Sequence, residues 1–97
     1  MAYFIFARFK VKLGTINSFL SELEKAAQLT RTEIGCLQYE YAIDAADENV
    51  VILFEKYVNL AAFEAHRSMD YLKSFRAAVS ELFDGEPLII RGAQEQI

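Results

Sequence analysis

The chain has 97 residues, of which 54% are hydrophobic, and its ten basic and fourteen acidic residues give a formal net charge of −4. This length suits one domain over residues 1–97, the apolar content excludes a disordered chain, and the acidic balance argues against nucleic-acid binding. A chain this short buries only about 60–65% of its unfolded surface on folding alone. So much apolar character on a small body therefore suggests a second subunit.

The location is expected to be cytoplasmic, without membrane contact. The apolar runs are far shorter than the roughly 20 residues of a spanning helix. The N-terminal apolar stretch is also too short for a signal peptide and has no basic region ahead of it. The single cysteine, Cys36, cannot form an intrachain disulfide, which is typical of a reducing compartment.

The first predicted element is a strand over residues 3–12, because the segment is rich in aromatic and β-branched residues. Gly14 ends this strand, and Thr15 is a candidate N-cap for the helix that follows. The apolar positions of this helix recur at helical spacing and form one face. They are Ile16, Phe19, Leu20, Leu23, Ala26 and Ala27.

A hairpin is predicted next. After a connection that ends at Gly35, the alternating segment 36–44 and the apolar segment from residue 49 or 50 to residue 57 read as two strands. The short polar turn between them joins the strands directly. Asn59 is then a candidate N-cap for a second helix.

The C-terminal part is predicted to hold a further helical segment and a last strand. The segment starts near Ser68, and its apolar residues keep helical spacing as far as Phe83. Asp84 to Pro87 should stop it, with Gly85 in the left-handed conformation that closes many helices. A strand follows from Leu88 to Arg91 or beyond.

The element order β-α-β-β-α-β predicts an α+β, ferredoxin-like fold, in which an antiparallel sheet carries both helices on one face. Both faces of the strands are nevertheless apolar, since Tyr3 and Ile5 alternate with Phe4 and Phe6. A large uncovered apolar face marks an interaction site. We therefore expect a homodimer that packs sheet against sheet with two-fold symmetry.

His66 and Glu55 are the candidate catalytic residues. His66 is the only histidine, and Phe63 lies three residues before it on the same helix face. It is either a packed core histidine with one hydrogen-bonded nitrogen or a general base in an apolar cavity. Glu55 lies on a mostly apolar strand face and needs a partner there. That partner is either a neighbouring polar group or His66, which Glu55 would then orient.

The remaining polar residues leave alternatives open. Tyr39 and Tyr71 are either ordinary packed tyrosines or hydrogen-bond donors to a substrate. Cys36 reads as a small core residue, and Arg31 and Glu33 as a surface ion pair. The chain lacks a second histidine or a cysteine cluster, a glycine-rich phosphate loop and a Gly-x-Ser-x-Gly elbow. We therefore expect neither a bound metal nor a flavin or nicotinamide cofactor.

Together these residues resemble the antibiotic biosynthesis monooxygenase family, whose small members are ferredoxin-like and assemble as dimeric α/β barrels. The resemblance covers nearly the whole chain. That family typically shows Glu-x-Gly-Cys, then Tyr, then Glu-x-Trp, then a histidine about ten residues further on. The matching segments are residues 30–40, 54–57 and 62–66, followed by Phe75.

Two departures from the family pattern matter. Tyr57 stands where the family usually has Trp. Residues 70–71 occupy the place of a second histidine found in many members, so proton transfer between two histidines is not available. The haem-degrading branch uses an Asn, a Trp and a haem-ligating His, and the matching positions here are Ala7, His66 and Arg76. Haem degradation is therefore not expected.

The resemblance implies a cofactor-free oxygenase that uses molecular oxygen on quinols, anthrones or similar small aromatic substrates. In this interpretation His66 is the base and Glu55 orients it. The substrate-binding candidates are Tyr57, Tyr39, Tyr71, Phe19 and Phe63. Two alternatives remain open: an isomerase that processes a bacterial signalling sugar phosphate, which would want an arginine or lysine in its pocket, and a non-enzymatic dimeric ligand-binding module of the same fold.

Overall fold

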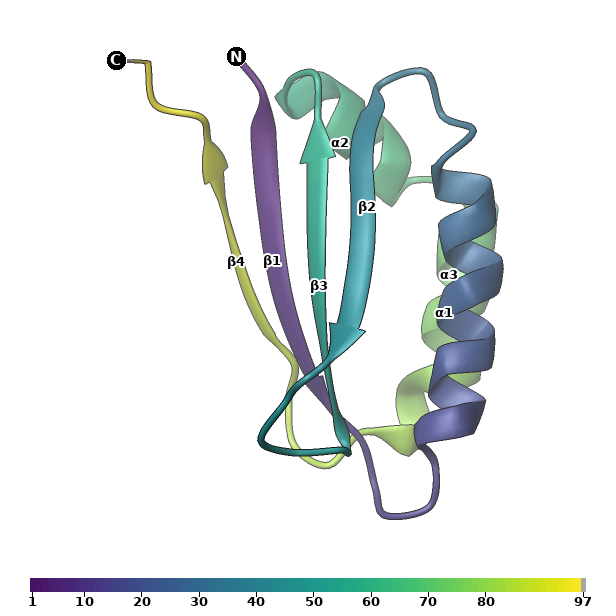
Figure 1. The fold of residues 1–97 in the computed structure, drawn as a ribbon. Helices are drawn as coiled ribbons and strands as arrows, with labels where there is room; N and C mark the ends of the chain where they lie inside the picture. The colour runs from purple at the N-terminus through teal and green to yellow at the C-terminus, as the bar shows by residue number, and fades with distance from the viewer. Residues whose placement is uncertain (97) are drawn as a thin grey trace.

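The computed structural model describes residues 1–96 and shows one antiparallel sheet with helices on one face (Figure 1). In chain order the elements are β1 (Tyr3–Lys10), α1 (Ile16–Thr30), β2 (Cys36–Ile43), β3 (Val50–Tyr57), α2 (Leu60–Arg67), α3 (Asp70–Val79), the 3₁₀ helix η1 (Ser80–Leu82) and β4 (Leu88–Ala93). The strand order is β2-β3-β1-β4, with every neighbouring pair antiparallel. The predicted ferredoxin-like α+β fold is confirmed. Among the described residues, no helix has the length and apolar character needed to cross a membrane.

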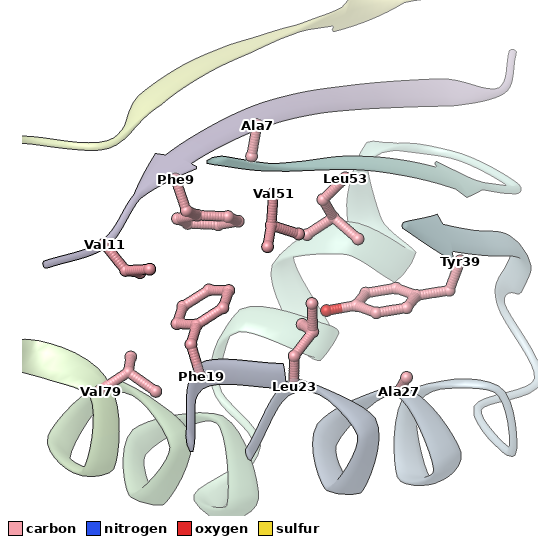
Figure 2. Packing of buried hydrophobic residues seen from close by; sticks show 10 residues of the cluster. All are labelled: Ala7, Phe9, Val11, Phe19, Leu23, Ala27, Tyr39, Val51, Leu53 and Val79. Carbon is pink, nitrogen blue, oxygen red and sulfur yellow. The ribbon is translucent and has the colours of Figure 1, made fainter. Parts of the chain in front are cut away.

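The main core lies between the sheet and the helix pair α1 and α3. Alternate residues of β1 and β3 point into it, as the two-residue period of a strand requires. The predicted apolar face of α1 packs against them, with Phe19, Leu23 and Ala27 fully buried. Figure 2 shows these three side chains directed at Phe9 and other strand residues, with Val79 of α3 beside them.

The helical segment after β3 is broken, which gives the fold three α-helices instead of two. Helix α2 ends at Arg67, and Met69 takes an extended conformation with ψ 137° before α3 begins at Asp70. The sequence predicts a break near Ser68, which is confirmed. Because of the break, α2 covers one end of the sheet while α3 runs beside α1 (Figure 1).

The predicted end of the last helix was wrong. Helix α3 ends at Val79, and the chain leaves helical geometry completely at Phe83. Phe83 instead forms an isolated antiparallel bridge with Val11, just beyond the end of β1. Gly85 does take a left-handed conformation, with φ 87°, but it serves the turn into β4. A backbone contact distant in sequence therefore overrides the helical spacing of Phe83.

The two predicted N-caps differ in outcome. The side chain of Asn59 accepts a hydrogen bond of 2.8 Å from the backbone N–H of Ala62, which confirms it as the cap of α2. Thr15 does precede α1, but its hydroxyl donates to the carbonyl oxygen of Lys12 at 2.6 Å. The side chain of Thr15 therefore fixes the turn before α1 and does not cap the helix.

The face of the sheet away from the helices is apolar and uncovered. Phe6, Ile52 and Ile90, on three adjacent strands, are 54%, 45% and 59% exposed. Together with Phe54 and Leu88 they line an open groove of about 410 Å³. The uncovered apolar face expected from the sequence is therefore present.

We expect this outer face to join two copies of the chain. Sedimentation at micromolar concentration should give about twice the chain mass of 11.1 kDa. Ile52→Lys should yield a folded monomer, because it places a charge in the middle of the apolar face. Ile34→Lys is the matched control, since Ile34 is fully exposed in the turn before β2. A wild-type monomer would contradict the expectation.

Candidate functional site

Side chains from several parts of the fold converge on His66. The imidazole is 4% exposed and belongs to α2. Its Nδ1 lies 2.9 Å from Oε2 of Glu33, in the turn after α1, and its Nε2 lies 3.5 Å from Oε1 of Glu55, on β3. The only histidine of the chain is thus held between two carboxylates.

Local structure explains how β3 and α2 supply their part of the site. Glu55 and Tyr57 are two residues apart on β3, so both point to the helix-bearing face of the sheet. Asn59 starts α2 almost immediately, which places the helix over this end of the sheet. Phe63 and His66 are three residues apart on α2 and share its buried face.

Glu33 links His66 to the helix pair. Its Oε2 accepts a hydrogen bond from the Tyr71 hydroxyl as well as facing Nδ1 of His66. The Tyr71 hydroxyl also lies 3.1 Å from Oγ1 of Thr30, which is fully buried and donates to the carbonyl oxygen of Ala26 at 2.8 Å. The carboxylate of Glu33 is therefore tied to α1, α2 and α3 at once.

The expected surface ion pair between Arg31 and Glu33 was wrong. Arg31 donates from Nε to the carbonyl oxygen of Tyr39 at 3.0 Å, and its Nη2 lies 3.6 Å from Glu40. Glu33 is only 12% exposed at its side chain and is used inside the site. The two residues are close in sequence, but the Arg31 side chain contacts β2 and the Glu33 side chain contacts His66 on α2.

The two ring nitrogens of His66 have different hydrogen-bond partners. Glu33 is an acceptor, so Nδ1 carries a proton and donates to it. The 3.5 Å between Nε2 and Glu55 exceeds the usual range of about 2.7–3.2 Å for a nitrogen–oxygen hydrogen bond. Nε2 is therefore the ring nitrogen without a short hydrogen bond.

Glu55 is a carboxyl group with altered acidity. Burial raises its pKa above the ordinary value of 4.5, and the nearby Glu33 adds to the rise. The Tyr57 hydroxyl, which donates to Oε1 of Glu55 at 2.6 Å, and the neighbouring His66 oppose it. A carboxyl whose pKa lies above its usual range is a better proton acceptor than an exposed one.

The tyrosines of the site are suited to donate hydrogen bonds. Burial is the largest cause that raises the pKa of Tyr39, Tyr57 and Tyr71 well above the ordinary value. Their hydroxyls therefore keep their protons near neutral pH. In Figure 2 the hydroxyl of Tyr39 points into the space between the sheet and α1.

Aromatic rings surround the imidazole. Ring centres lie 5.1 Å from that of His66 for Tyr57, 6.3 Å for Phe63, and 6.4 Å for both Tyr39 and Tyr71. Six of the seven predicted site residues are thus gathered in one cluster: His66, Glu55, Tyr57, Tyr39, Tyr71 and Phe63. An aromatic, largely dry surrounding of this kind strengthens every charge interaction of the imidazole.

Phe19 is the predicted site residue that the structure does not bring to this cluster. It is fully buried on α1, with ring centres of Phe9 at 5.3 Å and Phe83 at 6.0 Å. Figure 2 shows Phe19 and Tyr39 apart, with Leu23 between them. Phe19 belongs to the main core.

Cys36 carries no thiolate. Its thiol is half-buried and donates to the carbonyl oxygen of Gln38 at 3.5 Å. Burial raises the pKa of the thiol to about 11, and Glu33 and Glu55 act in the same direction. The small residue expected in the core is partly buried and packs against both clusters of buried residues.

Gly35 holds the turn of Glu33 against α2. A Cβ atom on Gly35 would lie 2.5 Å from the Cβ of Ala62, so only glycine allows this close approach. The carbonyl oxygen of Gly35 also accepts a hydrogen bond of 2.9 Å from the N–H of Val58. The close approach of Glu33 to His66 therefore requires glycine at position 35.

Comparisons with known proteins agree on one family. The model of a family described as antibiotic biosynthesis monooxygenase matches residues 2–78. "Putative monooxygenase YcnE" of Bacillus subtilis is 31% identical over 85 residues, which are 88% of this chain and 90% of that protein. "Putative monooxygenase Rv0793" of Mycobacterium tuberculosis is 31% identical over 78 residues, which are 80% of this chain and 76% of that protein.

Solved structures show the same fold. The structure of Rv0793 from Mycobacterium tuberculosis has a TM-score of 0.92 and 25% identity, and the match covers 100% of this chain and 98% of the other. Protein SO0527 from Shewanella oneidensis has a TM-score of 0.89 and 26% identity, with 96% and 90% of the two chains covered.

The raised pKa of Glu55 predicts a pH-dependent difference between the wild type and Glu55→Gln. A carboxyl whose pKa is higher in the folded protein than in the unfolded chain binds more protons when folded, so its contribution to stability falls as pH rises. The free energy of unfolding of the wild type minus that of Glu55→Gln should therefore decrease as pH rises above 4.5. Urea denaturation between about pH 4 and pH 8 measures it.

The control for this series is Glu24→Gln, which removes an exposed carboxylate from α1. Its difference from the wild type should stay flat over the same range. A difference for Glu55→Gln that grows with pH would show that the folded state favours the charged carboxylate.

Gly35→Ala should destabilise the protein by about 1–3 kcal/mol, because the new methyl group would overlap with Ala62 and push the turn away from α2. Thermal unfolding followed by circular dichroism measures the effect. Gly92→Ala is the matched control, since no atom lies within 4 Å of a Cβ placed there. Equal melting temperatures for the two variants would contradict the close packing.

Proposed function

The chain belongs to the antibiotic biosynthesis monooxygenase family, and from this membership we propose that it oxidises a quinol, an anthrone or a similar small aromatic compound with molecular oxygen. The proposed reaction uses neither a metal nor a flavin. Its protein contribution is to remove a proton from the substrate and to stabilise the anion that results.

The observation that carries this proposal is the position of His66 between Glu33 and Glu55. A neutral imidazole with a proton on Nδ1 has its free electron pair on Nε2. When Nε2 takes a proton from the substrate, the ring becomes an imidazolium. Glu33 on one side and Glu55 on the other then stabilise the new charge, as a buried carboxylate does for the histidine of a catalytic triad.

The proposed reaction balances without a further reactant. The substrate carbon that is oxidised carries two hydrogens in the keto form, and loss of one proton to His66 gives an electron-rich anion. The anion transfers one electron to oxygen, and the resulting radical and superoxide combine to form a carbon–oxygen bond. The peroxide, protonated from His66, loses water as the second hydrogen leaves the carbon. One oxygen atom stays as the carbonyl of the quinone, and the other leaves as water.

The neighbouring residues take supporting roles in this proposal. The raised pKa keeps the Tyr39 hydroxyl protonated, so that it can donate to a developing oxyanion, and such stabilisation is often the largest contribution to catalysis. Tyr57 is bound to Glu55 and Tyr71 to Glu33, so these two also position the carboxylates. Tyr39 is therefore the first candidate for contact with substrate. Phe63 forms part of the apolar surrounding of the imidazole.

We also propose that residues 1–97 act as one domain, in the cytoplasm and as a homodimer. The family match spans most of the chain, and the uncovered apolar face of the sheet supports the dimer. The half-buried, unpaired thiol of Cys36 fits a reducing compartment.

His66→Ala tests the proposed base. Oxygen uptake with a quinol or an anthrone should fall by about 10²–10⁴, the usual contribution of general acid–base catalysis. The variant should stay folded enough to measure, because Glu33 keeps its hydrogen bond from Tyr71 and Glu55 keeps that from Tyr57. Melting temperature and oxygen uptake are measured on the same preparation.

Ser68→Ala is the matched control, since Ser68 is exposed at the end of the same helix and bonds only its own backbone turn. Its oxygen uptake should equal that of the wild type. Unchanged uptake in a folded His66→Ala protein would remove His66 from the mechanism. A wild type that consumes no oxygen with either substrate class would instead favour a ligand-binding role.

A further inference from the structure

A row of side chains connects the buried cluster to the open edge of the sheet. Ile5 on β1 pairs with Glu55 on one side and with Arg91 of β4 on the other. Directly opposed residues of a sheet point to the same face, and neighbouring strands lie about 4.8 Å apart. Arg91 therefore starts on the helix-bearing face about 10 Å from Glu55, two strand spacings away.

This edge of the sheet is uncovered. All six residues of β4 are exposed, and Figure 1 shows β4 on the side of the sheet away from α1 and α3. Ile89, which shares the inner face with Arg91, is 57% exposed. The open edge thus combines an apolar side chain with a cation on the helix-bearing face, and the cation reaches Phe63 of the site.

Two guanidinium groups lie close to one aromatic ring of the site. The guanidinium carbon of Arg91 lies 5.4 Å from the ring centre of Phe63, and that of Arg67, at the end of α2, lies 5.7 Å from it. Both distances are within the range of a cation–π contact. The same Phe63 ring lies 6.3 Å from the imidazole of His66. The cations therefore border the cluster itself.

These cations are poorly neutralised. Arg67 approaches Glu64 only at 4.0 Å, with both side chains about half exposed, so the pair contributes little. Within residues 1–96, Arg91 has no carboxylate oxygen within 4.0 Å. In a chain of net charge −4, two weakly neutralised guanidinium groups beside one aromatic ring are an unusual concentration of positive charge.

We propose that Arg67 and Arg91 form a binding site for an oxyanion group of the substrate, a carboxylate or a phosphate. The substrate class is then an aromatic hydroxy acid or an aromatic phosphate. Its anionic group takes the bidentate hydrogen bonds that guanidinium groups offer, and its hydroxyl is directed at His66. This inference rests on the proposed function for the role of His66 alone; binding of the anion requires no turnover.

The experiment compares three probes of one ring system on the full chain: 1-naphthol, 1-hydroxy-2-naphthoate and 1-naphthyl phosphate. Isothermal titration calorimetry should show at least one of the two anions binding about tenfold tighter than naphthol, as expected for charge-assisted hydrogen bonds. The anion that binds more tightly than naphthol identifies the anionic group, carboxylate or phosphate, that the site prefers. The imidazole resonances of His66, unambiguous in a chain with one histidine, should shift with the bound probes.

Arg91→Gln and Arg67→Gln should each remove most of this preference and leave the affinity for naphthol unchanged. Lys73→Gln is the matched control, because it removes one positive charge from an exposed position on α3 and should change nothing. If one arginine variant fails to fold, the other still tests the site.

The failures of the two proposals are distinguishable. Equal affinity of the wild type for naphthol and both anions would overturn the oxyanion site, and so would an equal loss of preference in Lys73→Gln. Oxygen uptake with neutral quinols would still support the oxygenase in either case. Tight binding of an anion by a wild type that never consumes oxygen supports the oxyanion site and overturns the oxygenase.

Discussion

The hydrogen-bonded placement of two buried carboxylates around His66 is the constraint on which this end of the molecule depends. A buried carboxylate is costly by several kcal/mol unless it is paired and hydrogen-bonded. Glu33 and Glu55 satisfy this only because Tyr71 and Tyr57 donate to them and His66 lies between them. The partners come from β3, α2, α3 and the turn after α1, so these elements must meet at one point. The break between α2 and α3 serves this requirement by letting one helix carry His66 and the next carry Tyr71.

Local periodicity explains what could be predicted of the site. Glu55 and Tyr57 share a face because a strand repeats every two residues, and Phe63 and His66 share one because a helix repeats every 3.6. Both rules relate residues that are close in sequence, so the sequence alone predicts that these residues share a face. Glu33 lies in a turn, where no period applies, and its partner His66 is 33 residues further along the chain. The contact between Glu33 and His66 follows only from how the turn packs on α2.

Contacts between distant parts of the chain explain where the structure departs from the sequence predictions. A helical pattern tells which face of α1 is buried but not which end of the sheet each residue meets, and Phe19 meets Phe9 instead of the His66 cluster. A pattern also cannot weigh a helix against a distant backbone partner. Phe83 keeps helical spacing, yet the bridge to Val11 takes it out of α3. The sequence alone indicates no role for Arg91, because its alignment with Glu55 across Ile5 follows only from the strand order and register.

Negative and positive side chains lie at opposite ends of the site. The deep end holds Glu33 and Glu55, and the open edge holds Arg67 and Arg91, with Phe63 between the two groups. An anionic substituent placed at the deep end would face two carboxylates at close range, which is unfavourable in a poorly solvated interior. At the edge it would meet two cations. In the proposed reaction, the carboxylates that stabilise a protonated imidazole therefore also disfavour the reversed binding mode, so one arrangement of charges serves both the proposed proton transfer and the proposed orientation of the substrate.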